Sequence, residues 1–226
     1  MNFNLGWLRP LWLGVMVAGM FCQTSGMAVA ATSTYTSSAD FFTALGATPF
    51  VTETYESYPI NSTIPAGTLL NGINYDSFPI GADGRVDNNY NRLGDASLAL
   101  QRGLNSFAFF FPGESFSVTF ENPVYGVGIF FNVVESPVDS LFINTPVGNA
   151  LTGGATYDQG TLYFAGLISD TPFSSVTIGG DATIGSGYNV DNLTYVTNPI
   201  PEPSAWMVTA GLLGLACWVR RGATRA

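Results

Sequence analysis

The sequence contains no histidine and no lysine, and its two cysteines and four tryptophans all lie within thirty residues of one end. The segment from residue 31 to residue 200 therefore lacks all four residue types. This excludes a Ser-His-Asp triad, a thiolate nucleophile, a disulfide and a zinc site with His or Cys ligands from that segment. Carboxylates are the acid-base groups that remain there.

Positive charge is also scarce. Fifteen of the sixteen carboxylates lie between residues 31 and 200 against three arginines, so this segment has a formal charge of −12. Nucleic acids and anionic lipid headgroups are bound through Lys and Arg, and such a surface repels them. The balance favours a soluble exported protein, or one that binds divalent cations.

The first thirty residues are typical of a secretory signal peptide. Arg9 precedes an apolar run over residues 11–21, and Ala28 and Ala30 supply the small residues for cleavage before Ala31. Such a signal implies export through the Sec translocon. An uncleaved N-terminal anchor is the alternative.

The last twenty-six residues have three parts. Pro201, Glu202 and Pro203 are followed by an apolar stretch over 204–219 and then by a basic end. At 1.5 Å per residue a helix over 204–219 is about 24 Å long, and interfacial aromatic residues, snorkelling arginines and local thinning let it span a bilayer. The positive-inside rule places its basic end in the cytoplasm. The residues of this predicted membrane helix and stop are Trp206, Gly211, Gly214, Trp218, Arg220, Arg221 and Arg225.

This tail resembles the PEP-CTERM sorting signal of Gram-negative bacteria. The resemblance covers the Pro-Glu-Pro motif, the short helix and the basic end, and nothing upstream. It implies handling by an exosortase, a membrane protease that acts near the motif, and delivery from the inner membrane to the cell surface or extracellular matrix. An ordinary C-terminal anchor after a proline-rich linker is the alternative.

The segment between the two ends, residues 31–198, is expected to be one mainly β domain. A helix is predicted at residues 38–46, with Ser37 or Ser38 as N-cap and Gly46 at its end. Strands are predicted at 50–58, 69–78, 96–101, 140–144, 161–167, 174–178 and 188–196, with a loop over 81–94. Residues 115–120 and 124–134 are predicted to form a hairpin around a turn at Glu121, Asn122 and Pro123. This pattern predicts an antiparallel β-sandwich with one short N-terminal helix, followed by the C-terminal transmembrane helix. The segments around 116–134 and 179–195 resemble the jelly-roll domains of PEP-CTERM proteins.

Two kinds of ligand site are weighed in this domain. Calcium needs six to eight oxygens, and one candidate set is Asp83 and Asp87 in the predicted loop. The other joins Glu53 or Glu56 to Asp191 on the last strand, and ordinary turn chemistry explains the first set without metal. A sugar site needs exposed aromatic platforms. The tyrosines considered for that role are Tyr55, Tyr58, Tyr75, Tyr90, Tyr157 and Tyr163.

The function predicted from these features is a non-enzymatic surface or biofilm-matrix protein with no cofactor, and a structural Ca²⁺ is the alternative to that absence. Its partners are the Sec translocon, an exosortase and the inner membrane, with exopolysaccharide as a further partner. One alternative is a carbohydrate-binding module. Another is a glycoside hydrolase that uses two carboxylates about 5–9.5 Å apart. The candidate acids for that reaction are Glu53, Glu56, Asp76, Glu114 and Glu135.

Overall fold

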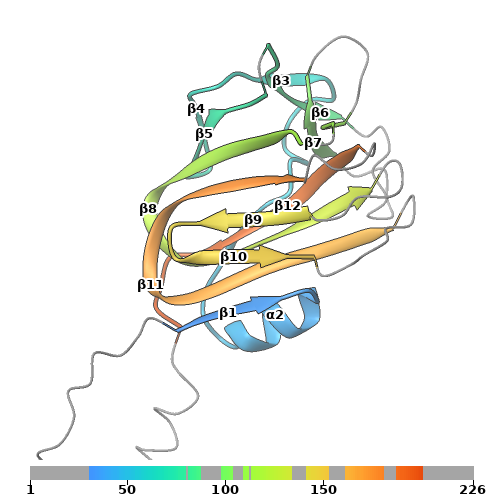
Figure 1. The fold of residues 1–226 in the computed structure, drawn as a ribbon. Coiled ribbons are helices and arrows are strands. Elements are labelled where there is room, and N and C mark those ends of the chain that lie inside the picture. Colours follow the sequence, from blue (N-terminus) through green and yellow to red (C-terminus); the bar gives the residue numbers. More distant parts are fainter. Residues whose placement is uncertain are drawn as a thin grey trace, which may run out of the picture.

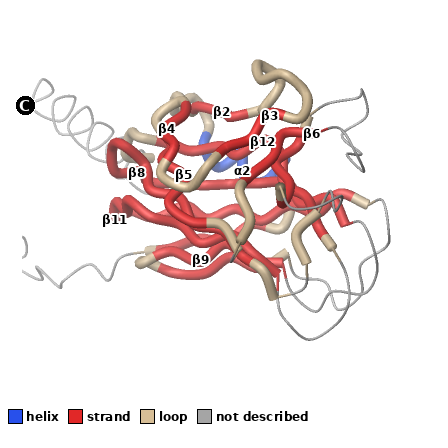
Figure 2. The backbone as a smooth tube through the Cα atoms, turned by 90° about the horizontal axis from the view of Figure 1, so that it is seen from above, coloured by secondary structure: helices blue, strands red, loops and turns tan. Residues whose placement is uncertain are grey.

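The structure is a computed structural model of the 226-residue chain, and it describes residues 31–79, 81–87, 98–103, 109–111, 113–133, 141–152, 161–180 and 187–200. Twelve strands form one antiparallel sheet with one short helix against it (Figures 1 and 2). The elements are β1 Thr32–Tyr35, α2 Ser38–Leu45, β2 Val51–Glu53, β3 Ser62–Ile64, β4 Thr68–Leu70, β5 Ile73–Ser77, β6 Gly84–Asp87, β7 Ala99–Arg102, β8 Ser115–Val133, β9 Leu141–Thr145, β10 Gly148–Leu151, β11 Leu162–Gly180 and β12 Tyr188–Val196. The coarse prediction of a mainly β, antiparallel domain with one N-terminal helix is confirmed.

Two long strands fold this sheet over on itself. β8 and β11 pair along nearly their whole length, and their register shifts between Ile168 and Ser175, where Phe173 lies opposite Val124. Both strands bend on the same side of the molecule (Figure 1). On one side of the bend they pair with β9 and β5, and on the other side with β1 and β12. Each long strand therefore belongs to two layers.

The main core lies between these layers. Phe116, Val118 and Val176 come from the first layer, and Ile129 and Val190 from the second. All five side chains are at most 1% exposed. Successive side chains of a strand point to opposite faces of the sheet, so every second residue of these strands packs into one apolar interior.

Helix α2 covers the outer face of the second layer. The side chain of Ser37 accepts a hydrogen bond from the backbone N–H of Asp40 at 3.3 Å, and Gly46 ends the helix with a φ of 58°. Phe41 and Leu45 pack with Phe164 and Val196 in a second, smaller apolar cluster. This helix and its N-cap confirm the prediction for residues 38–46.

Several predicted boundaries are wrong. The hairpin expected at Glu121, Asn122 and Pro123 is a bend within β8, because β11 bends beside it and keeps pairing on both sides. The strands expected at 161–167 and 174–178 are likewise one strand, β11. In the other direction, the strand expected over 69–78 is a hairpin of β4 and β5.

The remaining differences concern short elements. The strand expected over 50–58 is limited to β2, and the loop expected over 81–94 contains β6. β6 pairs with β3 on one side and β7 on the other, so tertiary pairing overrides its turn-forming composition. Residues 88–94 lie outside the described residues.

No helix within the described ranges is both long and apolar enough to span a bilayer. The helix predicted over 204–219 lies outside those ranges, as does the signal peptide predicted over 1–30.

Candidate functional site

Glu53 is the centre of a buried hydrogen-bond network at the end of β2. Its side chain is 2% exposed. One carboxylate oxygen accepts the backbone N–H of Tyr55 at 2.7 Å, and the other accepts the Tyr58 hydroxyl at 3.0 Å and the Asn71 side-chain amide at 2.5 Å. The carbonyl of Asn71 accepts the Tyr195 hydroxyl at 2.7 Å. The carboxylate thus joins β2, the following segment, the β4–β5 turn and β12.

Several phenols near this carboxylate have raised pKa values. Burial, followed by the charge of Glu53 and its hydrogen bond, raises the pKa of Tyr58 to about 12. Burial also raises the pKa of Tyr55 well above its usual value, with further contributions from Tyr75, Glu53 and Asp191. Tyr58 and Tyr55 therefore stay protonated near neutral pH and can donate hydrogen bonds there.

Two of the predicted calcium ligands contribute to the raised pKa of one buried phenol. The negative charges of Glu53 on β2 and Asp191 on β12 both raise the pKa of Tyr55, after burial and the contact with Tyr75. Asp191 is 2% exposed and accepts the backbone N–H of Asn192 at 2.6 Å. Glu56 is exposed and accepts the N–H of Leu98 at 2.6 Å. Both oxygens of Glu53 already accept hydrogen bonds, so the contacts there satisfy the carboxylate without a cation.

The other predicted calcium pair lies on and beside β6. Asp87 is 2% exposed and forms an ion pair with Arg85 at 2.6 Å. The carbonyl of Asp83 accepts the N–H of Gly103 at 2.8 Å. Across the described part of the chain, no three Asp or Glu side chains gather closely enough to hold a metal ion. Calcium binding at either place stays a prediction.

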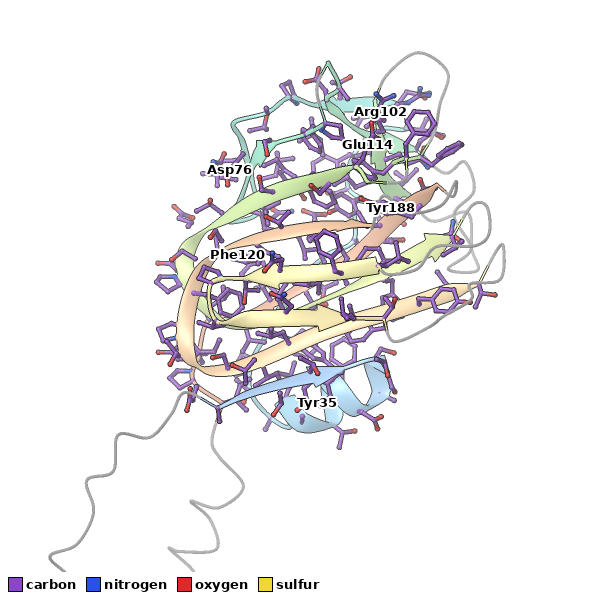
Figure 3. All side chains as sticks on the ribbon, viewed as in Figure 1. Tyr35, Asp76, Arg102, Glu114, Phe120 and Tyr188 are labelled. Carbon is purple, nitrogen blue, oxygen red and sulfur yellow. The ribbon has the colours of Figure 1, made fainter. Side chains whose placement is uncertain are left out.

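The candidate catalytic acids have separate partners. Glu114 forms an ion pair with Arg102 at 2.9 Å and accepts the N–H of Phe111 at 2.8 Å. Asp76 accepts hydrogen bonds from Asn74 and Thr119 on the exposed side of the sheet. Figure 3 shows Glu114 beside Arg102 and well apart from Asp76. Glu135 lies outside the described residues.

The tyrosines divide into buried and partly exposed groups. Tyr55 and Tyr75 are fully buried, and their hydroxyls lie 3.1 Å apart, so neither ring can serve as a sugar platform. Tyr58 and Tyr163 keep part of their surface exposed. Tyr90 and Tyr157 lie outside the described residues.

A polar face that the sequence analysis did not single out covers the first layer. Its members lie opposite one another across β5, β8, β11 and β9 with their side chains on the side away from the core. They are Asn74, Ser77, Ser117, Thr119, Asn144 and Thr177. The strict alternation of Ser and Thr with apolar residues along 115–120 is the signal that could have found it. We call these six residues the polar face.

The predicted processing sites flank the described domain. Ala31 is exposed, its backbone N–H donates to the Asp170 carboxylate at 2.9 Å, and its carbonyl accepts the Asp170 N–H at 3.2 Å. β1 begins one residue later, so regular pairing starts directly after the predicted cleavage point. Ala28 and Ala30 lie outside the described residues, as does the motif Pro201 to Pro203.

Comparison with protein-family profiles and with curated proteins gave no match. Two solved structures with partial likeness are catalytic domains of a GH87 alpha-1,3-glucanase, one in complex with tetrasaccharides and the other with nigerose. The first has a TM-score of 0.34 and 14% identity, and the match covers 69% of this chain and 29% of that one. The second has a TM-score of 0.33 and 16% identity, covering 68% and 29%. The chain spans less than a third of the length of these structures.

Proposed function

We propose that this chain is an exported protein of the cell surface or extracellular matrix, sorted by its last residues. The observation that carries the proposal is the order of Pro201-Glu202-Pro203, the apolar stretch over 204–219 and the terminal arginines. The last strand, β12, ends at Val196. The described core is thus formed from residues that precede the motif, which supports a body over 31–198 and a separate sorting signal over 199–226.

In the proposed sequence of events, the Sec translocon exports the chain and the C-terminal helix holds it in the inner membrane. An exosortase then acts near Pro201-Glu202-Pro203, as the resemblance to PEP-CTERM proteins implies. Ala210, Gly211 and Gly214 offer small residues along which another membrane helix can pack closely.

The body is proposed to be a jelly-roll-like β-sandwich with a structural or adhesive role. The antiparallel pairing and the core between two layers support this assignment. A non-enzymatic role is supported by the structural contacts of two candidate acids. Glu53 accepts hydrogen bonds from Tyr55 and Tyr58, and Glu114 forms an ion pair with Arg102 and accepts a hydrogen bond from Phe111.

Sorting can be tested by pulse-labelling the chain in strains with and without an exosortase. We expect a size decrease and release from the inner membrane only where the protease is present, and both are lost when Pro201, Glu202 and Pro203 are changed to alanine. Pro199→Ala, an exposed proline two residues upstream, is the matched control and leaves processing intact. Equal size and location in both strains would refute the sorting proposal.

Binding of neutral exopolysaccharide is a second candidate function, and the polar face favours it. Uncharged hydroxyl and amide groups there can bond sugar hydroxyls, and the neighbouring Asp76 carboxylate accepts hydrogen bonds from Asn74 and Thr119. A glycan array with the secreted protein tests this. Thr177→Val together with Ser117→Val is expected to abolish binding, and Thr34→Val, on exposed β1, leaves it unchanged. Absence of binding by the unaltered protein would remove this candidate.

A further inference from the structure

Both ends of the described domain leave the sheet at the same place. Ser33 lies opposite Ile168, Ile168 opposite Gly126, and Gly126 opposite Val196. Four neighbouring strands are about 4.8 Å apart, so this row spans only about 14 Å. In Figure 1 the start of β1 and the chain that follows β12 meet at one lower corner of the molecule.

The end of helix α2 returns to this corner and forms a hollow with the chain exit. The hollow has a volume of about 420 Å³ and is lined by residues 44–49 and 198–200. Next to it, Phe50 is 47% exposed and Val51 is 44% exposed. The Phe50 ring lies 5.2 Å from the ring of Phe42, and Phe42 and Ile200 are partly buried against the smaller core cluster. We call Phe42, Phe50, Val51 and Ile200 the exit patch.

The exit patch is uncharged within a strongly acidic domain. No ionisable side chain lies between Asp40 and Glu53, and no carboxylate or arginine lies between Asp191 and Glu202. Exposed carboxylates occur nearby at the bends of the long strands, at Glu121 and Asp170. An apolar surface that lacks charge in such surroundings suits an apolar partner better than an ionic one.

We propose that the exit patch rests on the interfacial region of the lipid bilayer while the C-terminal helix anchors the chain. This inference depends on the membrane anchor of the proposed function. Ile200 is four residues before Ser204, where the predicted membrane helix begins, and four residues span at most about 14 Å. The signal peptide predicted over 1–30 attaches at the same corner, so both membrane-directed segments bring this end of the domain to the bilayer until cleavage before Ala31, and the C-terminal helix does so afterwards.

The contact is apolar in character. Phe and Val side chains gain free energy when they enter the headgroup and acyl boundary, whereas Glu121 and Asp170 are repelled by anionic headgroups. The contact is therefore expected in neutral lipid, to persist at high salt and to weaken as anionic lipid is added.

Depth-dependent fluorescence quenching tests this with the full chain in phosphatidylcholine vesicles that contain spin-labelled lipid. Cys22 and Cys217 are changed to serine, and one probe is attached through Ala47→Cys at the hollow. The control probe, through Asn144→Cys, sits on the polar face. We expect several-fold stronger quenching at position 47. Phe50→Ser with Val51→Ser is expected to reduce it to the level of position 144, with an unchanged circular dichroism spectrum because both side chains are about half exposed.

The outcomes separate this inference from the proposed function. A chain that does not float with the vesicles lacks the membrane anchor, which overturns both. A chain that floats but shows equal quenching at the two positions overturns the exit-patch contact and leaves the anchor standing. Quenching that requires anionic lipid, or a second protein from the cell envelope, also overturns it.

Discussion

At the scale of single residues, Tyr58, Tyr188 and Tyr195 are hydrogen-bond donors whose environment keeps them protonated. Burial is the largest cause of the raised pKa of Tyr58, Tyr188 and Tyr195, and the next is the charge of a neighbouring carboxylate, Glu53 or Glu114. The hydroxyl of Tyr188 donates to the carbonyl of Glu114 at 2.6 Å. An ionised phenol cannot donate a hydrogen bond. The stabilisation from these contacts is therefore lost as the pH becomes strongly alkaline.

Tyr58 makes this dependence measurable. Its pKa is raised to about 12 in the folded chain, from 10.0. Its bond to Glu53 therefore contributes fully below pH 10, and the contribution is lost as pH rises through 12. Tyr58→Phe is expected to lower the free energy of unfolding by about 1 kcal/mol at pH 8, and to differ less from the unaltered protein as pH approaches 12.

Urea unfolding at a series of pH values measures this effect. Tyr35→Phe is the control, because no hydrogen bond of its hydroxyl exists among the described residues, and it should show the same pH profile as the unaltered protein. A constant difference for Tyr58→Phe up to pH 12 would contradict the assignment.

Gly72 is required by the turn that carries Asn71 to Glu53. Asn71 and Gly72 have φ values of 48° and 77°, the left-handed pair that a two-residue β-hairpin turn needs. A Cβ at Gly72 would lie 3.0 Å from the Tyr195 hydroxyl oxygen. Gly72→Ala is expected to cost about 1–2 kcal/mol in backbone strain and about 1 kcal/mol more for the disturbed Tyr195 bond.

Gly67→Ala measures the loss of stability that comes from backbone strain alone. Gly67 has a φ of 83° and open space around the missing Cβ. Thermal or urea unfolding of the two variants should show the greater loss for Gly72→Ala, and equal losses would show that the Tyr195 contact contributes nothing.

At the scale of elements, the sequence carries signals for those helices and turns whose formation depends on residues close together in the chain. The helix at Ser38–Leu45 has its cap residue and its terminal glycine in the sequence, and it formed as predicted. The β4–β5 hairpin also had a local signal, Asn71-Gly72, which the prediction of one strand over 69–78 passed over. The boundaries that depend on a partner strand could not be found locally.

The long strands show why. Glu121-Asn122-Pro123 has the composition of a turn, yet β8 continues through it because β11 follows the same bend. Pairing between residues about fifty positions apart leaves no local trace in either strand. The Glu53 network was out of reach for the same reason, since its donors Tyr58 and Asn71 and the supporting Tyr195 are spread along the chain. From the sequence, Glu53 or Glu56 was paired with Asp191 only as a candidate calcium site, and that site stays a prediction.

The contact between α2 and the sheet depends on a cross-strand pair of glycines. Gly128 on β8 lies opposite Gly166 on β11, and the rings of Phe164 and Phe41 pack over them. A Cβ at Gly128 would lie 2.7 Å from the Phe164 ring and 3.1 Å from the Phe41 ring. Gly128→Ala is therefore expected to destabilise the fold by about 1–3 kcal/mol.

Gly126→Ala is the matched control on the same strand. A Cβ there first meets the carbonyl oxygen of Leu167 at 3.4 Å, which is an ordinary contact. Equilibrium unfolding should show a change close to zero for this variant. A similar loss for both would mean that strand conformation, and not ring packing, determines the need for glycine.

At the scale of the whole molecule, the acidic charge governs the response to ions. With fifteen carboxylates between residues 31 and 200, the domain repels itself, and dissolved salt reduces this repulsion. Any cation produces that effect. A structural calcium site would add a stabilisation that sodium cannot supply.

Thermal unfolding in CaCl₂ and in NaCl at equal ionic strength distinguishes the two effects. Because both oxygens of Glu53 accept hydrogen bonds and Asp87 pairs with Arg85, we expect similar shifts of Tm in both salts. A larger shift in CaCl₂ that Asp191→Asn removes would instead establish the site predicted at Glu53 and Asp191. Asp76→Asn, on the exposed polar side, is the control for loss of one charge.

The position of β12 has a consequence for the order in which the protein can fold. This strand pairs with β8, β7 and β2, and the hydroxyls of Thr52 and Thr194 meet at 2.9 Å although they are 142 residues apart. In a chain synthesised from its N-terminus, the edges of β8, β7 and β2 that face β12 therefore stay unpaired until nearly the whole chain has emerged. In the export route proposed above, the domain would close only at the end of translocation, once residue 196 has crossed and just before the proposed C-terminal anchor stops in the membrane.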